Sequence, residues 1–134
     1  MAEHANVSTF VACDKVIQEE GTHKKTIVGI FKNFNFNNLP ARFGPWFIFA
    51  QISNLDSGKA DVTINIVHDS TQGVVFAARL GIPEDHPEDI DICIRADAAE
   101  FDKEGKYVAT LNIDGQQFAY YVLTVSLTKQ QTGG

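Results

Sequence analysis

The stretch from Gly105 to Leu127 constrains the fold more than any other part of this chain. Apolar and polar residues alternate on both sides of Asp114-Gly115, a dipeptide that is a strong signal for a tight β-hairpin. Because alternation with a period of two marks a strand with one buried face, this stretch predicts two long antiparallel strands. A lone hairpin is at best marginally stable in water, so other strands must cover its apolar face.

Two registers fit this hairpin. A two-residue turn at Asp114-Gly115 would place Leu111 opposite Phe118, and the apolar phase would then slip near Tyr121. A three-residue loop, Ile113-Asp114-Gly115, with Gly115 left-handed, avoids the slip. We predict this second register, because a shift of one residue turns a whole strand over. It places the following residues on one face: Tyr107, Ala109, Leu111, Ala119, Tyr121, Leu123, Val125 and Leu127.

Six further runs have strand character, and no window shows a sustained helical period: 9–18, 25–36, 46–53, 60–68, 74–80 and 90–94. Residues 60–68 alternate most cleanly, and residues 74–80 should complete a second hairpin with them. Gly29 inside its strand indicates a bulge or a close contact. We therefore predict an all-β sandwich of about eight antiparallel strands. Its predicted core contains Trp46, Val62, Ile64, Ile66, Phe76, Leu111, Tyr121 and Leu123.

The strand at 46–53 is apolar on both faces. Trp46, Ile48, Ala50 and Ile52 would share one face, and Phe47 and Phe49 the other. Two-sided apolarity indicates a central strand, or a strand whose outer face is also covered.

Length and composition predict one globular domain over residues 1–134, with flexible ends at 1–8 and 129–134. Apolar residues make up 44% of the chain and charged residues 21%, which is typical of a folded globular protein. The net charge of −6 argues against a nucleic-acid surface. No apolar run is long enough to span a membrane, and the first residues do not resemble a signal peptide, so we expect a cytoplasmic location.

No catalytic constellation is evident. His68, Asp69 and Ser70 are adjacent, but consecutive residues at a strand end point in different directions, which favours a polar turn over a catalytic triad. Cys13 and Cys93 lie in apolar runs without metal-ligand spacing, and we expect two buried free thiols. A disulfide between them is the alternative, which a cytosolic location disfavours. No catalytic residue and no cofactor is therefore assigned.

An acidic loop is the one candidate metal site. Five carboxylates fall within eight residues: Glu84, Asp85, Glu88, Asp89 and Asp91. Hard cations such as calcium bind clustered oxygens. Calcium binding is therefore one hypothesis, and a solvated acidic loop is the other.

Two resemblances follow from short motifs. Asp102 to Tyr107 resembles the tyrosine corner of immunoglobulin-like sandwiches, in which a tyrosine hydroxyl bonds to upstream backbone; Trp46 matches their core tryptophan. The resemblance implies that Tyr107 is buried and bonds near Phe101 or Asp102. The chain also resembles small bacterial proteins of unknown function through Ala12-Cys13-Asp14, Gly29-Ile30-Phe31 and the hairpin from Gly105 to Gly115. That resemblance implies no activity.

Immunoglobulin-like strand order would place the 46–53 strand in one sheet with the final hairpin. The outer face of that sheet would then carry an apolar patch made of Phe47, Phe49, Phe118, Tyr120 and Val122. Such a patch needs a cover. We predict a symmetric homodimer; the alternatives are that the loop 34–43 covers the patch, or that Phe47 and Phe49 face the core.

Three functional hypotheses follow. The first is a non-enzymatic module that binds itself or another protein, without nucleic acid or membrane as a partner. The second is a small-ligand-binding protein or enzyme with a site at an end of the sandwich, which a concave pocket with convergent polar groups would favour. The third is calcium-dependent binding through the acidic loop.

Overall fold

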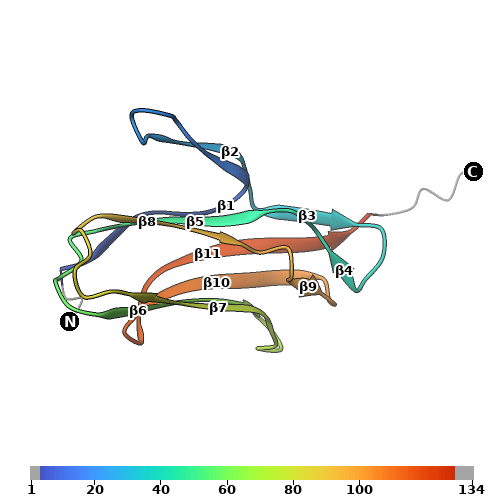
Figure 1. The fold of residues 1–134 in the computed structure, drawn as a ribbon. Helices are drawn as coiled ribbons and strands as arrows, with labels where there is room; N and C mark the ends of the chain where they lie inside the picture. Colours follow the sequence, from blue (N-terminus) through green and yellow to red (C-terminus); the bar gives the residue numbers. More distant parts are fainter. Residues whose placement is uncertain (1–3, 129–134) are drawn as a thin grey trace, which may run out of the picture.

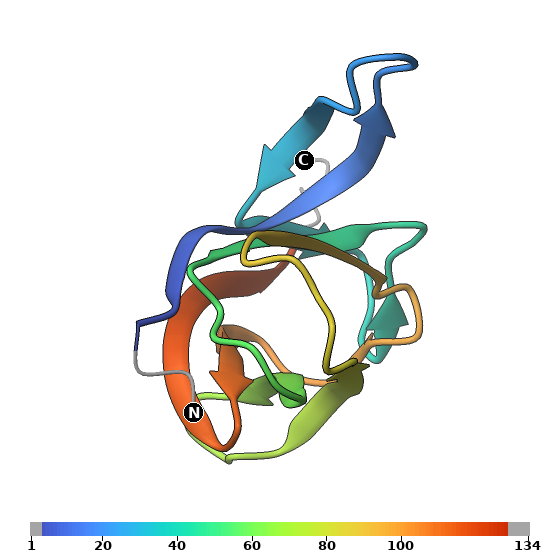
Figure 2. The ribbon, with the colours of Figure 1, turned by 60° about the vertical axis from the view of Figure 1, so that its left-hand side comes forward.

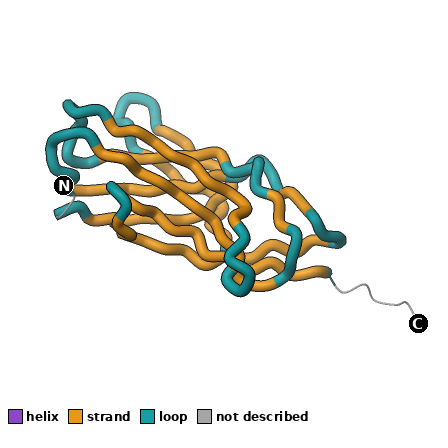
Figure 3. The backbone as a smooth tube through the Cα atoms, turned by 90° about the horizontal axis from the view of Figure 1, so that it is seen from below, coloured by secondary structure: helices purple, strands orange, loops and turns teal. Residues whose placement is uncertain are grey.

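The computed structural model describes residues 4–128, and every element in them is a strand or a loop (Figure 3). The all-β prediction is therefore confirmed for the described chain, but the expected number of about eight strands is wrong. The described residues form eleven strands: β1 (Asn6–Gln18), β2 (Lys25–Phe31), β3 (Asn33–Phe36), β4 (Ala41–Arg42), β5 (Phe47–Ser53), β6 (Ala60–His68), β7 (Val74–Ile82), β8 (Ile90–Arg95), β9 (Glu100–Phe101), β10 (Gly105–Ile113) and β11 (Gln116–Leu127).

Near the N-terminus, strand structure begins within the expected flexible end at 1–8. β1 already begins at Asn6, so residues 6–8 belong to a strand and not to a flexible end. Residues 1–3 and 129–134 lie outside the described residues. Residues 4–128 contain no helix that is long and apolar enough to cross a membrane.

The strands form two main layers (Figure 1). One layer is a four-stranded sheet in the order β2-β1-β5-β8, and the other a five-stranded sheet in the order β3-β11-β10-β6-β7. A short ribbon pairs β4 with β9. The expected single strand at 25–36 is two strands, because the chain leaves the four-stranded sheet after Phe31 and pairs with β11 in the other sheet from Asn33. This pairing is parallel, so the expectation of antiparallel strands throughout is wrong.

The final hairpin has the predicted shared face but not the predicted loop. Asp114 and Gly115 both have positive φ, 50° and 83°, and Ile113 pairs directly with Gln116, so the turn has two residues. Leu111 nevertheless lies opposite Ala119 and not opposite Phe118, because the ladder shifts by one residue inside β11. The extra residue that keeps the apolar face in phase is thus a bulge at Phe118.

The core lies between the two layers. The side chains of β6 alternate between buried and half-exposed along the whole strand, as predicted. The predicted core residues are buried except Phe76, which is half-buried because its strand, β7, forms the edge of its sheet.

The second half of β1 and β2 form a hairpin from Asp14 to Phe31, here called the arm. The arm leaves the plane of the four-stranded sheet (Figures 1 and 2). Gly29 has a φ of +70°, and a Cβ at that position would overlap the Asp14 carboxylate. The predicted close contact at Gly29 is therefore confirmed. It lies where the arm begins, and a larger residue would not fit there.

The start of β2 reaches back to β8. The Lys25 ammonium lies 2.8 Å from the Asp91 carboxylate, although β2 and β8 are the opposite edges of the four-stranded sheet. This contact requires the arm to pass over the outer face of β1 and β5. Phe49 on that face is only 1% exposed, and Cys13 is fully buried. The two-sided apolarity of the 46–53 strand is therefore explained by a cover from within the same chain.

Both thiols are free as expected, but only Cys13 is buried; Cys93 lies exposed on the edge strand β8, so its expected burial is wrong. Burial raises the pKa of Cys13 to about 11, with Cys93 and Asp14 adding to the rise. Burial also raises the pKa of Cys93, and Lys25 partly opposes that rise. We expect Ellman's reagent to label the exposed Cys93 in the native protein and to label Cys13 only on unfolding, because Cys13 is inaccessible and remains protonated.

Mass spectrometry of the labelled protein identifies which thiol reacted. Equal labelling of both thiols in the native protein would contradict a closed arm. A raised folded-state pKa also means that stability falls as the pH rises from the ordinary thiol value towards about 11.

Candidate functional site

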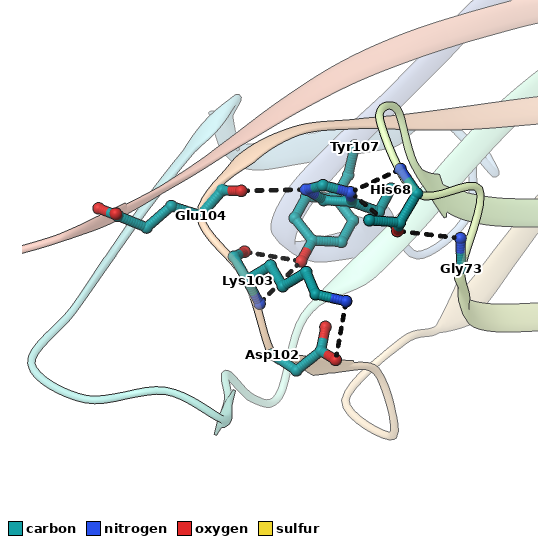
Figure 4. Close-up of polar contacts among 7 residues, drawn as sticks. His68, Gly73, Asp102, Lys103, Glu104 and Tyr107 are labelled. Carbon is teal, nitrogen blue, oxygen red and sulfur yellow. Dashed lines mark hydrogen bonds and ion pairs between the residues drawn. The ribbon is translucent and has the colours of Figure 1, made fainter.

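The end of the molecule near Tyr107 holds a cluster of polar contacts around the buried side chains of Tyr107 and His68 (Figure 4). The Tyr107 ring is fully buried, its hydroxyl donates to the Lys103 carbonyl at 2.7 Å, and the Lys103 N–H donates back to it at 3.3 Å. The expected partner was the backbone near Phe101 or Asp102, and the observed one is the next residue along the chain. Burial raises the pKa of Tyr107, which favours the protonated hydroxyl that donates this bond.

Tyr107→Phe tests this corner. The change removes the hydroxyl and leaves the part-buried Lys103 carbonyl without that donor, so we expect a loss of about 1–2 kcal/mol in the free energy of unfolding. Urea denaturation measures the loss. Tyr120→Phe removes an exposed hydroxyl from the same sheet as a control. Equal midpoints for the two variants would show that the corner contributes nothing.

His68 packs against this corner, with its ring 4.8 Å from that of Tyr107. The Thr71 N–H donates to Nδ1 at 3.2 Å, so Nδ1 carries no proton, and Nε2 donates to the Glu104 carbonyl at 3.0 Å. Both ring nitrogens are thus committed to backbone partners. Ser70 is exposed in the turn, so His68, Asp69 and Ser70 form the predicted polar turn and not a triad.

A cleft of about 520 Å³ opens beside this corner and is lined in part by His68, Thr71, Val75, Glu100, Asp102 and Lys103. Its charged groups already have partners. Glu100 lies 3.5 Å from Arg42, and Lys103 lies 4.0 Å from Asp102. The cleft therefore has room for a small molecule, but its charged groups do not converge on an open point.

The acidic loop joins β7 to β8 at the other end of the molecule. The Asp89 carboxylate accepts the Asn54 N–H at 3.2 Å, and Asp91 forms the ion pair with the arm. The other three side chains, Glu84, Asp85 and Glu88, are exposed. Nowhere in residues 4–128 do three His, Cys, Asp or Glu side chains form a group that could hold a metal ion.

The five residues of the predicted apolar patch do not form one patch. Phe47 and Phe49 lie on β5 in the four-stranded sheet, whereas Phe118, Tyr120 and Val122 lie on β11 in the five-stranded sheet. The assumed strand order was wrong, because β5 pairs with β1 and β8 and not with the final hairpin. Phe49 is buried, and Tyr120 is 65% exposed.

The outer face of the five-stranded sheet carries two rows of uncharged side chains, here called the uncharged face. Pairing aligns one residue from each of β11, β10, β6 and β7 in each row. The first row is Tyr120, Thr110, Asn65 and Ala77, and the second is Val122, Val108, Val67 and Val74. Charged residues flank the uncharged face at both ends. Asp61 and Arg79 lie beyond the first row, and Lys106 and Asp69 lie beyond the second.

Sequence reasoning found Tyr120 and Val122 but missed Val67, Val74 and Val108. The alternation in β6 and β10 places Val67 and Val108 on the outer faces of their strands. Only the pairing of four strands shows that these residues are neighbours.

Comparisons with known proteins identify one matching family and several solved structures with low sequence identity. The model of a family of unknown function, DUF6941, matches residues 8–126. No curated protein matches the chain.

Two solved structures resemble the fold. A β-glucosidase from Listeria innocua in complex with glucose gives a TM-score of 0.48 at 7% identity, over 91% of this chain and 16% of that one. The alkylpurine DNA glycosylase AlkC of Pseudomonas fluorescens, bound to DNA containing an abasic site analog, gives a TM-score of 0.43 at 12% identity. The match covers 90% of this chain and 30% of that one. This chain therefore spans less than a third of either protein.

Proposed function

This protein belongs to DUF6941, a family of unknown function, and we propose that it is a non-enzymatic module that binds another protein through the uncharged face. The observation that carries the proposal is the absence of charge from two rows of side chains across four strands. Although the chain has a net charge of −6, neither row carries a carboxylate. Interface centres are depleted in charged residues and enriched in tyrosine.

Two side chains on this face are strongly exposed. Tyr120 is 65% exposed and Val74 is 62% exposed, at opposite sides of the sheet. Residues that dominate binding at protein interfaces are enriched in tyrosine, tryptophan and arginine, so Tyr120 is the candidate anchor on this face. Between Tyr120 and Val74, β6 and β10 are each paired on both sides, so the middle of this face is a continuous sheet, whereas Val74 itself lies on the edge strand β7.

The cleft beside Tyr107 supports the alternative of a small-ligand site less well. Its volume is sufficient, but His68, Glu100, Asp102 and Lys103 already have partners within the chain. A ligand would have to displace these contacts to be recognised by them.

Affinity capture from an extract of the native host tests the proposal. The wild-type protein should retain a specific protein that Tyr120→Glu loses, because the new carboxylate would lose its hydration within the contact without gaining a partner. Ile30→Glu, on the arm, is the matched control, since Ile30 is 57% exposed on a different surface. Circular dichroism confirms that both variants are folded. Equal capture by both variants would reject the uncharged face as the binding surface.

Calcium binding through the acidic loop is a separate hypothesis. The Asp91 carboxylate pairs with Lys25, and that of Asp89 accepts a backbone N–H, so a cation would compete with both contacts. We expect millimolar calcium to leave the melting temperature unchanged, with magnesium as the control. A rise with calcium alone would show that the loop rearranges into a binding site.

The immunoglobulin-like description of the fold is also a proposal. The Tyr107 corner supports it, because the tyrosine bonds to backbone four residues upstream at the start of the hairpin.

A further inference from the structure

The outer edge of β7 is an open strand edge. β7 is the last strand of the five-stranded sheet and pairs only with β6. We propose that β7 pairs with β7 of a second copy of this chain, antiparallel and centred on Ala78, to form one continuous ten-stranded sheet. Unpaired backbone groups along an edge are a template for another strand.

The other sheet edges differ from β7. β3 has four residues, and β8 has six and carries the exposed charges of Asp91 and Arg95. β2 belongs to the arm. β7 has nine residues without proline, and its single charged residue is Arg79. Short strands and charges are the usual protection against edge pairing, so β7 is the least protected of these edges.

β7 is self-complementary about Ala78. In the proposed pairing Phe76 faces Leu80 of the second copy, and Ala77 faces Arg79 of the second copy. Phe76 and Leu80 are on the core side of the strand, since they pair with Ile66 and Val62 of β6. Leu80 is 39% exposed in the single chain and would gain an aromatic neighbour. Aromatic and aliphatic side chains that lie directly opposite stabilise antiparallel pairs.

The charges are compatible with a twofold pair. Arg79 already lies 2.9 Å from Asp61 of its own chain, so its charge is balanced on the outer face. The register places no two like charges directly opposite each other. The one irregularity of β7 is a ladder shift between Val74 and Phe76, which lies outside the central pairs.

This inference does not depend on the proposed function. It uses the backbone edge of β7 and leaves the uncharged face open. It would place two uncharged faces side by side in one sheet, and the two surfaces can be tested by different variants.

Sedimentation velocity across a micromolar concentration series tests the dimer. The wild-type protein should dimerise, and Leu80→Lys should raise the dissociation constant by more than about tenfold, because an inward-pointing lysine opposes edge pairing. Leu127→Lys is the matched control: Leu127 is also 39% exposed but lies on β11, away from β7. A wild-type monomer throughout the series, or a dimer that Leu80→Lys leaves intact, would overturn the proposal.

A disulfide cross-link tests the register and does not require Leu80→Lys to fold. Ala78→Cys in a Cys93→Ser background should form a covalent dimer on mild oxidation, because the two Cβ atoms would lie opposite each other across the twofold axis. Ala119→Cys is the control, since Ala119 is also half-buried but lies on β11. Absence of a covalent dimer with Ala78→Cys, or equal yields from both variants, would reject the register. A dimer lost with Tyr120→Glu but kept with Leu80→Lys would reject edge pairing and assign self-association to the uncharged face.

Discussion

Phe49→Ala should destabilise the protein by about 3–5 kcal/mol. Phe49 is 1% exposed although its neighbours Ile48 and Ala50 point into the core between the sheets. Phe49 therefore lies on the other side of β5, outside that core, and we infer that the arm covers it. Truncation to alanine would leave a cavity there, and the paired strands around it can collapse only in part.

The same variant should expose Cys13. Because Cys13 is buried on the same side of the sheet, a loosened arm would increase its labelling by Ellman's reagent. Ile17→Ala is the control, since Ile17 lies on the arm but is 45% exposed, and it should change stability by less than about 0.5 kcal/mol. A similarly small loss for Phe49→Ala, measured by urea denaturation, would mean that the arm does not enclose Phe49.

Ile64→Ala should lower the free energy of unfolding by about 2–5 kcal/mol. Ile64 is fully buried at the centre of β6, where it pairs with Leu111 on one side and Ala78 on the other. Neighbouring side chains cannot fill the space, because strands on both sides hold β6 in place.

Thr63→Ala is the control for Ile64→Ala. Thr63 precedes Ile64 on the same strand, points to the outer face and is half-exposed, so the change should cost less than about 1 kcal/mol. Thermal unfolding of the two variants gives the comparison. A larger loss for Thr63→Ala would reverse the assignment of the faces of β6.

Local features could be predicted from the sequence because they depend on near neighbours. The alternation of β6 required only the period of its apolar residues. The turn at Asp114-Gly115 followed from the residue types, but the bulge was assigned to the loop and not to Phe118. Both placements keep the apolar face in phase, and the local pattern does not distinguish them.

The two apolar faces of residues 46–53 predicted that the outer face of this strand is covered. The sequence did not predict that the arm is the segment that covers Phe49. Residues 9–18 read as one straight strand because no proline or glycine interrupts them. The arm contacts β8 through Lys25 and Asp91, which are far apart in the sequence. A homodimer and the loop 34–43 were considered as covers, and neither is needed for Phe49.

The assignment of strands to sheets was the main error. The patch of Phe47, Phe49, Phe118, Tyr120 and Val122 required β5 to lie beside the final hairpin. Long-range pairing is decided by the whole set of strands, and here β1 pairs with β5 while β6 takes the place beside β10. Tyr120 and Val122 remain candidates because they lie on a face of their own sheet.

Photo-cross-linking from Tyr120 tests the proposed binding surface most directly. A photoreactive phenylalanine analogue replaces Tyr120 in the native host, and the same analogue at Ile30 serves as the control. Interface contact predicts a discrete covalent adduct at Tyr120 and none at Ile30. The mass of the adduct then shows whether the partner is another protein or a second copy of this chain. If position 120 yields no adduct while the protein is folded and expressed, the uncharged face is not a binding surface.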